Sequence, residues 1–164
     1  MTIFASSILS SPVGDLTLVA SGRGLVAVLW PDDDPARVQL PAMQDDAGHP
    51  VLRQAATQLA DYFAGERHAF DLPLDFRGTE FQQRVWAALL TIPFGQTRSY
   101  GAIAAMIGQP TASRAVGAAN GRNPLSIIAP CHRVIGGNGA LTGFAGGMET
   151  KGWLLDFERR TLAI

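Results

Sequence analysis

The most reactive group in this sequence is the thiol of Cys131, its only cysteine, in the run Pro-Cys-His-Arg-Val at residues 130–134. A single thiol cannot form an intramolecular disulfide, and the sequence has no cluster of cysteines that could hold zinc. The thiol is therefore either a packed side chain or a nucleophile. His132 and Arg133 follow directly, and positive charge beside a thiol lowers its pKa, which favours the nucleophile.

The residues before the cysteine predict how the chain presents it. The apolar run at residues 127–129 predicts a short buried strand, and Pro130 ends it because proline cannot donate to a strand ladder. Cys131 is then the first residue past the strand end. Neighbouring side chains in extended backbone point to opposite faces, so His132 needs a water or a bent backbone to take the thiol proton. This adjacency disfavours a papain-like hydrolase, whose histidine lies far away in sequence.

The distribution of charge divides the chain into two halves. The 164 residues are 47% hydrophobic, enough for one domain or two small ones. Residues 1–77 carry 5 arginines against 10 acidic residues, whereas residues 78–164 carry 8 basic against 4 acidic residues. A basic half suits an anionic partner such as nucleic acid, and an acidic half would be held away from it.

The sequence also limits where in the cell the protein can act and which partners it can have. No apolar run approaches the length of a membrane span, so we expect no membrane partner. The N-terminus lacks a basic segment followed by an apolar one, and we expect no signal peptide. A free thiol without an export signal suits the reducing cytoplasm. No pattern indicates an oligomer, so we expect a monomer without an obligate protein partner.

The first half of the chain predicts a β-meander followed by a helix. Aliphatic stretches separated by Gly and Pro turns predict strands over residues 3–10, 16–20 and 25–30. We expect solvated loops over residues 31–35 and 41–50. Apolar residues near helical spacing predict a helix over residues 51–63, ending at Gly65, and then a linker over 72–78. The expected domains are therefore residues 1–77 and residues 78–164.

The second half begins and ends with a predicted helix. Thr79 is a plausible N-cap with Gln82 at the third helical position, and an apolar stripe continues to Leu90. Glycine-rich sequence over residues 136–147 predicts a loop. A last helix is expected over residues 151–160.

Between these two helices, two shorter helices are expected. Ser99 caps the first, over residues 100–107, and a turn containing Gly108 leads to the second, over residues 112–119. Two short helices joined by such a turn are typical of a helix-turn-helix, and also of a plain helical hairpin. Arg114 is the one long cation of the second helix. Small residues that would let a backbone approach DNA closely favour the first reading: Ala112, Ser113, Ala115, Gly117 and Ala118.

Taken together, these motifs resemble the O6-alkylguanine-DNA alkyltransferases, also called methylated-DNA–protein-cysteine methyltransferases. The matching segments occur in the family's order, at residues 94–100, 113–117, 123–124, 130–134 and 143–147. The resemblance implies an α+β fold, with a small ribonuclease-H-like domain of β-meander and helix as scaffold. A mostly helical, winged helix-turn-helix-like domain that binds DNA and accepts the alkyl group would follow.

The resemblance implies a reaction and its residues. Cys131 would take the alkyl group from guanine O6 in double-stranded DNA after the base has flipped out, once and irreversibly, with no cofactor. His132 would activate the thiol through a water, with Glu158 behind the histidine. Asn123 would hold the loop that carries the thiol. Tyr100 would help rotate the nucleotide and donate a proton to the departing base.

The same resemblance implies the DNA contacts and the substrate pocket. Arg114 would enter the duplex as a finger from a helix docked in the minor groove, beside Ser113, Ala115 and Gly117. Backbone groups of Cys131, Val134 and Ala145 would read the guanine edge. The remaining pocket residues would be Phe144, Ser126 and Lys151.

This chain departs from the family pattern at several positions. Phe144 stands where many relatives have tyrosine, and Ser126 where some have proline, so a hydroxyl contact is lost and the pocket wall is roomier. Some relatives hold zinc in the first domain with Cys and His ligands. Here that half has no cysteine and only His49 and His68, which predicts no metal.

Two other functions stay open at this point. One is a non-catalytic module that binds alkyl lesions, although relatives of that kind lack the cysteine. The other is a thiol hydrolase for a small substrate, which the adjacency of Cys131 and His132 disfavours. Plain structural roles also exist: Tyr100 as a packing residue and Glu158 in a surface ion pair. The sequence does not decide whether O4-alkylthymine is a further substrate.

Overall fold

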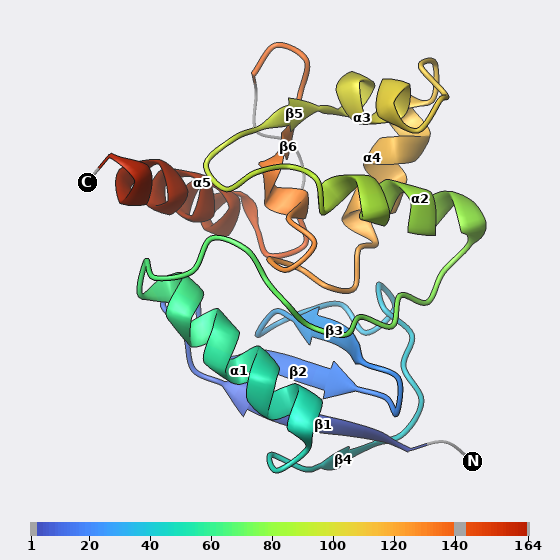
Figure 1. Ribbon diagram of the computed structural model, residues 1–164. Coiled ribbons are helices and arrows are strands. Elements are labelled where there is room, and N and C mark those ends of the chain that lie inside the picture. The colour runs from blue at the N-terminus through green and yellow to red at the C-terminus, as the bar shows by residue number, and fades with distance from the viewer. Residues whose placement is uncertain (1–2, 140–143, 164) are drawn as a thin grey trace. The chain divides into compact units, whose positions relative to one another are not determined.

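The chain divides into two compact units, Met1–Arg77 and Gly78–Ile164. The computed structural model describes residues 3–139 and 144–163 (Figure 1). Each unit buries apolar side chains of its own. Within the described residues, no helix is long and apolar enough to cross a membrane.

The first unit is built on a four-stranded sheet. Its strands are β1 (Phe4–Leu9), β2 (Leu16–Ala20), β3 (Leu25–Leu29) and β4 (Met43–Asp45), in the order β3-β2-β1-β4. The first three pair antiparallel and β4 pairs parallel to β1. The predicted meander is confirmed, with strand ends shifted by no more than one residue.

Strand β4 lies in a segment for which we expected only a loop. Its backbone pairs with β1, so that Phe4 lies opposite Met43 and Ser6 opposite Asp45. All three residues of β4 are exposed, and therefore the strand has no alternation of buried and exposed residues that the sequence could reveal.

The predicted linker also has a structural role that we did not expect. Leu74 forms an isolated parallel bridge with Leu25 at the free edge of β3. The backbone N–H of Leu25 donates to Pro73 O at 2.8 Å, and the N–H of Asp75 donates back to Leu25 O at 2.8 Å. These bonds cover an edge that would otherwise be open to pairing with another chain.

Helix α1 (Pro50–Phe63) packs on this sheet (Figure 1). His49 caps it, because its Nδ1 accepts from the N–H of Val51 at 3.2 Å, and Pro50 occupies the first turn where no N–H is needed. The face that the helix buries consists of Leu52, Ala55, Leu59 and Tyr62. The predicted helix is therefore confirmed.

The second unit is mostly helical, as predicted. Its elements are α2 (Glu80–Leu89), β5 (Arg98–Ser99), α3 (Tyr100–Met106), α4 (Ser113–Gly121), the 3-10 turn η1 (Cys131–Arg133), β6 (Val134–Ile135) and α5 (Met148–Leu162). The capping box of Thr79 and Gln82 and the Ser99 cap are both present. Helix α5 is longer at both ends than the predicted helix.

Two non-local contacts position the short helices α3 and α4. The parallel pairing of β5 with β6 places the start of α3 beside the segment that follows Cys131. Trp86 of α2, almost fully buried, donates its Nε1–H to Ala119 O of α4 at 2.9 Å. The helix-turn-helix is thus fixed both to the core and to the cysteine segment.

The strand that we predicted over residues 127–129 is wrong. These residues form a buried turn, and Ile127 adopts a φ of 74°, which extended backbone does not allow. Their apolar character is explained by burial in the interior and not by strand pairing. A short apolar run alone does not distinguish a buried strand from a buried turn.

Candidate active site

Cys131 lies at the end of this buried turn, where its side chain is only 3% exposed. Its N–H donates to Ala129 O at 2.7 Å. Asn123, fully buried, spans the turn: its Nδ2 donates to Ala129 O at 2.8 Å, and its Oδ1 accepts from the N–H of Leu125 at 3.0 Å. The backbone before the thiol is therefore fixed by one side chain at both its start and its end.

Behind the cysteine lies a buried polar network centred on Glu158. The Nε2 of His132 lies 2.7 Å from Glu158 Oε2, and both side chains are fully buried. Arg133 donates to both carboxylate oxygens, at 2.8 and 2.9 Å, and the N–H of Gly95 donates to Oε1 at 3.1 Å. Glu158 therefore does not form the surface ion pair considered from sequence.

The charges and the burial of this network determine which of its groups are protonated. Burial raises the pKa of Glu158, but hydrogen bonds and charges from His132 and Arg133 outweigh it and hold the pKa far below its ordinary value. Burial lowers the pKa of His132, an effect that Glu158 opposes without reversing it. We therefore assign an ionised carboxylate, with Arg133 as its cation, and a neutral imidazole.

This assignment leaves one histidine nitrogen available as a base. A carboxylate only accepts hydrogen bonds, so Nε2 of the neutral His132 must carry the hydrogen, and Nδ1 keeps a lone pair. That Nδ1 is buried and has no hydrogen-bond partner among the residues that the structure describes. The base thus belongs to the residue next to the thiol.

Lys151, also fully buried, contributes a cation near the thiol. Its Nζ donates to Val134 O at 2.6 Å and lies 5.9 Å from the centre of the Phe144 ring. Burial lowers the pKa of this ammonium, while the charge of the Cys131 thiolate opposes that shift. By the same interaction, the ammonium favours ionisation of the thiol.

Most of the residues predicted to contact DNA line one surface hollow. Its lining includes Tyr100, Ser113, Arg114 and Gly117, from the starts of α3 and α4. The ring of Tyr100 is half-buried and lies close to Gly117. Ala115 is exposed on α4 but is not among the lining residues.

The remaining predicted pocket residues are more scattered. Val134 is fully buried in β6, and Ser126 is 1% exposed, with no partner for its Oγ among the described residues. Phe144 is half-buried, and Ala145 is exposed in the turn before α5. Gly143, which belongs to the same motif, lies outside the described residues.

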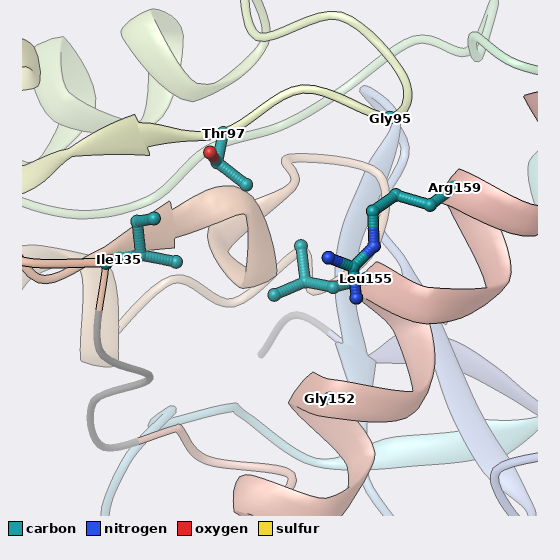
Figure 2. A pocket seen from close by; sticks show the side chains of 7 residues that line it. Gly95, Thr97, Ile135, Gly152, Leu155 and Arg159 are labelled. Carbon is teal, nitrogen blue, oxygen red and sulfur yellow. The ribbon is translucent and has the colours of Figure 1, made fainter.

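A separate cleft lies beside α5. Figure 2 shows Arg159 of α5 extending across it beside Leu155, opposite Thr97 and Ile135. Gly95, which donates to Glu158, is also part of the lining, but Cys131 is not. The residues described here contain no group of three or more His, Cys, Asp or Glu side chains arranged to hold a metal.

Sequence reasoning missed three residues that this geometry brings to the site. We noted Arg133 for its charge alone, although it ties Glu158 and also donates to Ile92 O at 2.7 Å. Gly95 looked like a simple turn residue; its φ is 81°, and a side chain there would overlap Leu162. Asn120 looked like a helix end, but its Nδ2 donates to Cys131 O at 3.4 Å. No local pattern marks any of these contacts.

A thiol, a neighbouring base and a nearby cation together suit nucleophilic attack on an electrophilic carbon. Comparison with known proteins points the same way. A family model described as "6-O-methylguanine DNA methyltransferase, DNA binding domain" matches residues 80–160, and one described as its ribonuclease-like domain matches residues 5–76.

Individual relatives match over nearly the whole chain. A methylated-DNA–protein-cysteine methyltransferase of Mycobacterium tuberculosis is 52% identical over 153 residues, which cover 92% of this chain and 90% of that protein. One from Methanosarcina acetivorans is 48% identical, covering 93% and 96%. The crystal structure of Mycobacterium tuberculosis OGT in complex with DNA superposes with a TM-score of 0.86 at 49% identity, covering 97% of this chain and 94% of that one.

Proposed function

Because the chain belongs to the 6-O-methylguanine DNA methyltransferase family, we propose a mechanism in which its own residues carry the alkyl transfer. The protein is a methylated-DNA–protein-cysteine methyltransferase that binds DNA and repairs it by direct reversal. The observation that carries the mechanism is the geometry of the buried His132, whose Nε2 lies 2.7 Å from Glu158 Oε2 while its Nδ1 has no hydrogen-bond partner among the described residues.

The transfer begins with the thiol proton. A water accepts it from Cys131 and passes a proton to His132 Nδ1, and Glu158 stabilises the imidazolium that forms. The thiolate attacks the alkyl carbon, so that a carbon–sulfur bond forms while the bond from that carbon to O6 breaks. The electron pair of the broken bond goes to the guanine, and a proton donated by Tyr100 neutralises the departing base.

Ionisation of the thiol alone supplies little of the rate. At a pKa of about 8.5, a few per cent of a thiol is ionised at neutral pH, and lowering the pKa by three units gains roughly 30-fold in thiolate. The loss of intrinsic nucleophilicity removes about 15- to 30-fold, if the slope for disulfide exchange applies to attack on carbon. Most of the acceleration must then come from alignment and from the proton donated to the base.

The product explains why each molecule acts once. Alkylated Cys131 is a thioether, which has no good leaving group that would release the alkyl carbon. Each protein molecule therefore repairs one lesion, and the reaction is stoichiometric. The buried Cys131 and its base also disfavour a module that only binds lesions, since such a module needs neither.

The target atom lies inside the base stack, so the nucleotide must flip out, at a cost of roughly a few kcal/mol. Arg114 is exposed at the start of α4 and suits the role of a finger that fills the gap. Tyr100, Ser113 and Gly117 line the same hollow and would contact the adjacent backbone, with Ala115 next to them on α4. The helix would dock in the minor groove.

The flipped base would enter a pocket beside the thiol. Backbone groups of Val134 and Ala145 would read its edge, and the Phe144 ring would pack over it. Lys151 supports this pocket because it holds the Val134 carbonyl at 2.6 Å and lies near the Phe144 ring. Ser126 would form part of the wall.

The remaining assignments concern the protein as a whole. The DNA-contacting and catalytic residues all lie in residues 78–164, the basic half, and residues 1–77 would act as a scaffold. Alkyl acceptance requires a reduced thiol, so we propose that the protein acts in the cytoplasm. We propose that it acts as a monomer without an obligate partner.

The test is to mix the protein with a duplex carrying one O6-methylguanine and analyse both products. We expect the intact protein to gain the mass of one methyl group and the base to become guanine. Tight lesion binding with no mass change would leave a recognition module and contradict the proposal.

A further inference from the structure

Asn120 links the helix proposed to contact DNA to the backbone of the nucleophile. It lies near the end of α4, six residues after Arg114, and its side chain is 4% exposed. Its Nδ2 donates to Cys131 O at 3.4 Å. The carbonyl that it holds belongs to the same residue as the reactive thiol. The mechanism above gives Asn120 no role.

The other half of this amide is unsatisfied. Asn120 Oδ1 is buried and has no hydrogen-bond partner among the described residues. Buried acceptors in native proteins nearly always have a partner, and one left without costs free energy. A site that keeps such an acceptor beside its nucleophile is prepared for a donor that arrives with the substrate.

The chemistry of the substrate restricts that donor. Alkylation at O6 removes the hydrogen from N1 of guanine, and N9 is bonded to the sugar. The exocyclic 2-amino group is then the only N–H donor left on the base, and it carries two hydrogens. The alkyl carbon must approach the Cys131 sulfur to about 3–3.5 Å, which brings the base close to the residue whose carbonyl Asn120 holds.

We propose that Asn120 is a specificity-determining residue, whose Oδ1 accepts a hydrogen bond from the 2-amino group of the flipped O6-alkylguanine while its Nδ2 holds the Cys131 carbonyl. This inference rests on the proposed function and adds a residue to it. It adds Asn120 to the backbone groups that would favour guanine over alkylated bases that lack the amino group.

The experiment compares two substrates that differ only in this amino group. Duplexes carrying O6-methylguanine or O6-methylhypoxanthine are mixed with excess protein, and the single-turnover rate constants for methyl transfer are measured. We expect the wild type to prefer O6-methylguanine. In Asn120→Ala the preference should fall about 3- to 10-fold, which is the effect of one hydrogen bond.

A second variant separates the acceptor from packing. Asn120→Asp keeps an acceptor at the same place but loses the donor to Cys131 O, so its rates should fall with both substrates while the preference remains. Gln83→Ala, which removes an exposed amide of the same unit, is the matched control and should change neither quantity. Thermal unfolding of each variant confirms that it is folded at the temperature of the rate measurements.

Two results would count against this role. Equal loss of rate with both substrates in Asn120→Ala would show that the residue only packs. An unchanged preference together with a shifted pH profile for alkylation of Cys131 by iodoacetamide would assign Oδ1 to the thiol, and overturn the inference. If the wild type transfers methyl from neither substrate, the proposed function itself fails, which is a distinct outcome.

Discussion

Each unit of this protein contains a carboxylate held by arginine, and in the mechanism that we propose only one of the two has a chemical use. In the first unit, Asp75 accepts from Ser21 Oγ at 2.6 Å and from Arg77 at 2.9 Å, and the Arg77 side chain is 51% exposed. In the second, Glu158 accepts from Arg133 and His132, and neither of its side-chain partners reaches far into solvent.

The two networks differ in the side-chain group that lies farthest from the carboxylate. The Asp75 network ends in an arginine that faces water. The Glu158 network ends in a histidine nitrogen that is buried, lacks a partner among the described residues and belongs to the neighbour of Cys131. An ion pair by itself stabilises structure, whereas an ion pair that orients a base beside a nucleophile supports catalysis.

The largest expected effect is on the rate of methyl transfer when the carboxylate of Glu158 is changed to an amide. The same change at Asp75 serves as its control. Glu158→Gln should slow methyl transfer by about two to four orders of magnitude, because His132 loses the group that fixes its tautomer and stabilises its imidazolium. It should also lower the free energy of unfolding by about 3–5 kcal/mol, since Arg133 is left buried without its anion. Single-turnover kinetics and urea unfolding measure the two effects.

Asp75→Asn is the control for that experiment. It should cost about 1 kcal/mol of unfolding free energy and leave the transfer rate of the folded protein unchanged. If both variants slow transfer equally, the distinction between the two networks is wrong.

The next effect compares two tyrosines. Tyr100→Phe should slow methyl transfer about 100-fold, because the departing guanine loses its proton donor, and it should do so without shifting the pH profile of Cys131 alkylation. Tyr62→Phe, in the core of the first unit, should change only the melting temperature. A full transfer rate in Tyr100→Phe with DNA binding intact would remove Tyr100 from the mechanism.

A smaller effect compares exposed arginines of the basic and acidic halves. Arg114→Ala should reduce the transfer rate at limiting DNA about 10-fold, since the gap left by the flipped base is no longer filled. Arg53→Ala, on α1 of the first unit, should leave it unchanged. Transfer rates are measured over a range of DNA concentrations. Equal effects of the two substitutions would indicate that Arg114 acts only through nonspecific charge and does not insert into the duplex.

The smallest expected effect is on stability as a function of pH. The pKa of His132 is lowered in the folded protein, so the unfolded chain binds a proton as pH falls below about 6.5 and the folded chain does not. Stability should then fall by at most about 1.4 kcal/mol per pH unit. The lowered pKa values of Glu158 and Asp75 add losses only below about pH 4.5.

Thermal unfolding of the wild type and of His132→Gln between pH 7.5 and 5 measures this effect. The variant should lose the pH dependence above pH 5. A wild-type melting temperature that stays constant over this interval would mean that His132 is protonated in the folded protein or titrates normally.

Local signals in the sequence were sufficient for most of the helices. The box of Thr79 and Gln82 and the cap at Ser99 involve residues within one turn, and both are present as predicted. The motif around Cys131 indicated the family for a similar reason, since its residues are adjacent in the chain, and the comparisons confirm that family.

Features that depend on distant partners were missed or wrong. The exposed strand β4 exists because β1 pairs with it, and the apolar residues 127–129 are buried in a turn that Asn123 holds. The burial of Glu158 depends on Arg133 and Gly95, which lie 25 and 63 residues away in sequence. The contact of Asn120 could not be predicted from sequence for the same reason, because its partner is the carbonyl of Cys131.

The most direct test of this account is a titration of the protein with an excess of O6-methylguanine duplex, followed by peptide mass mapping. We predict one methyl group per chain, located on Cys131, with no further repair however much lesion is added, and none in Cys131→Ser despite intact DNA binding. Methyl on another residue, or more lesions repaired than protein molecules present, would contradict it.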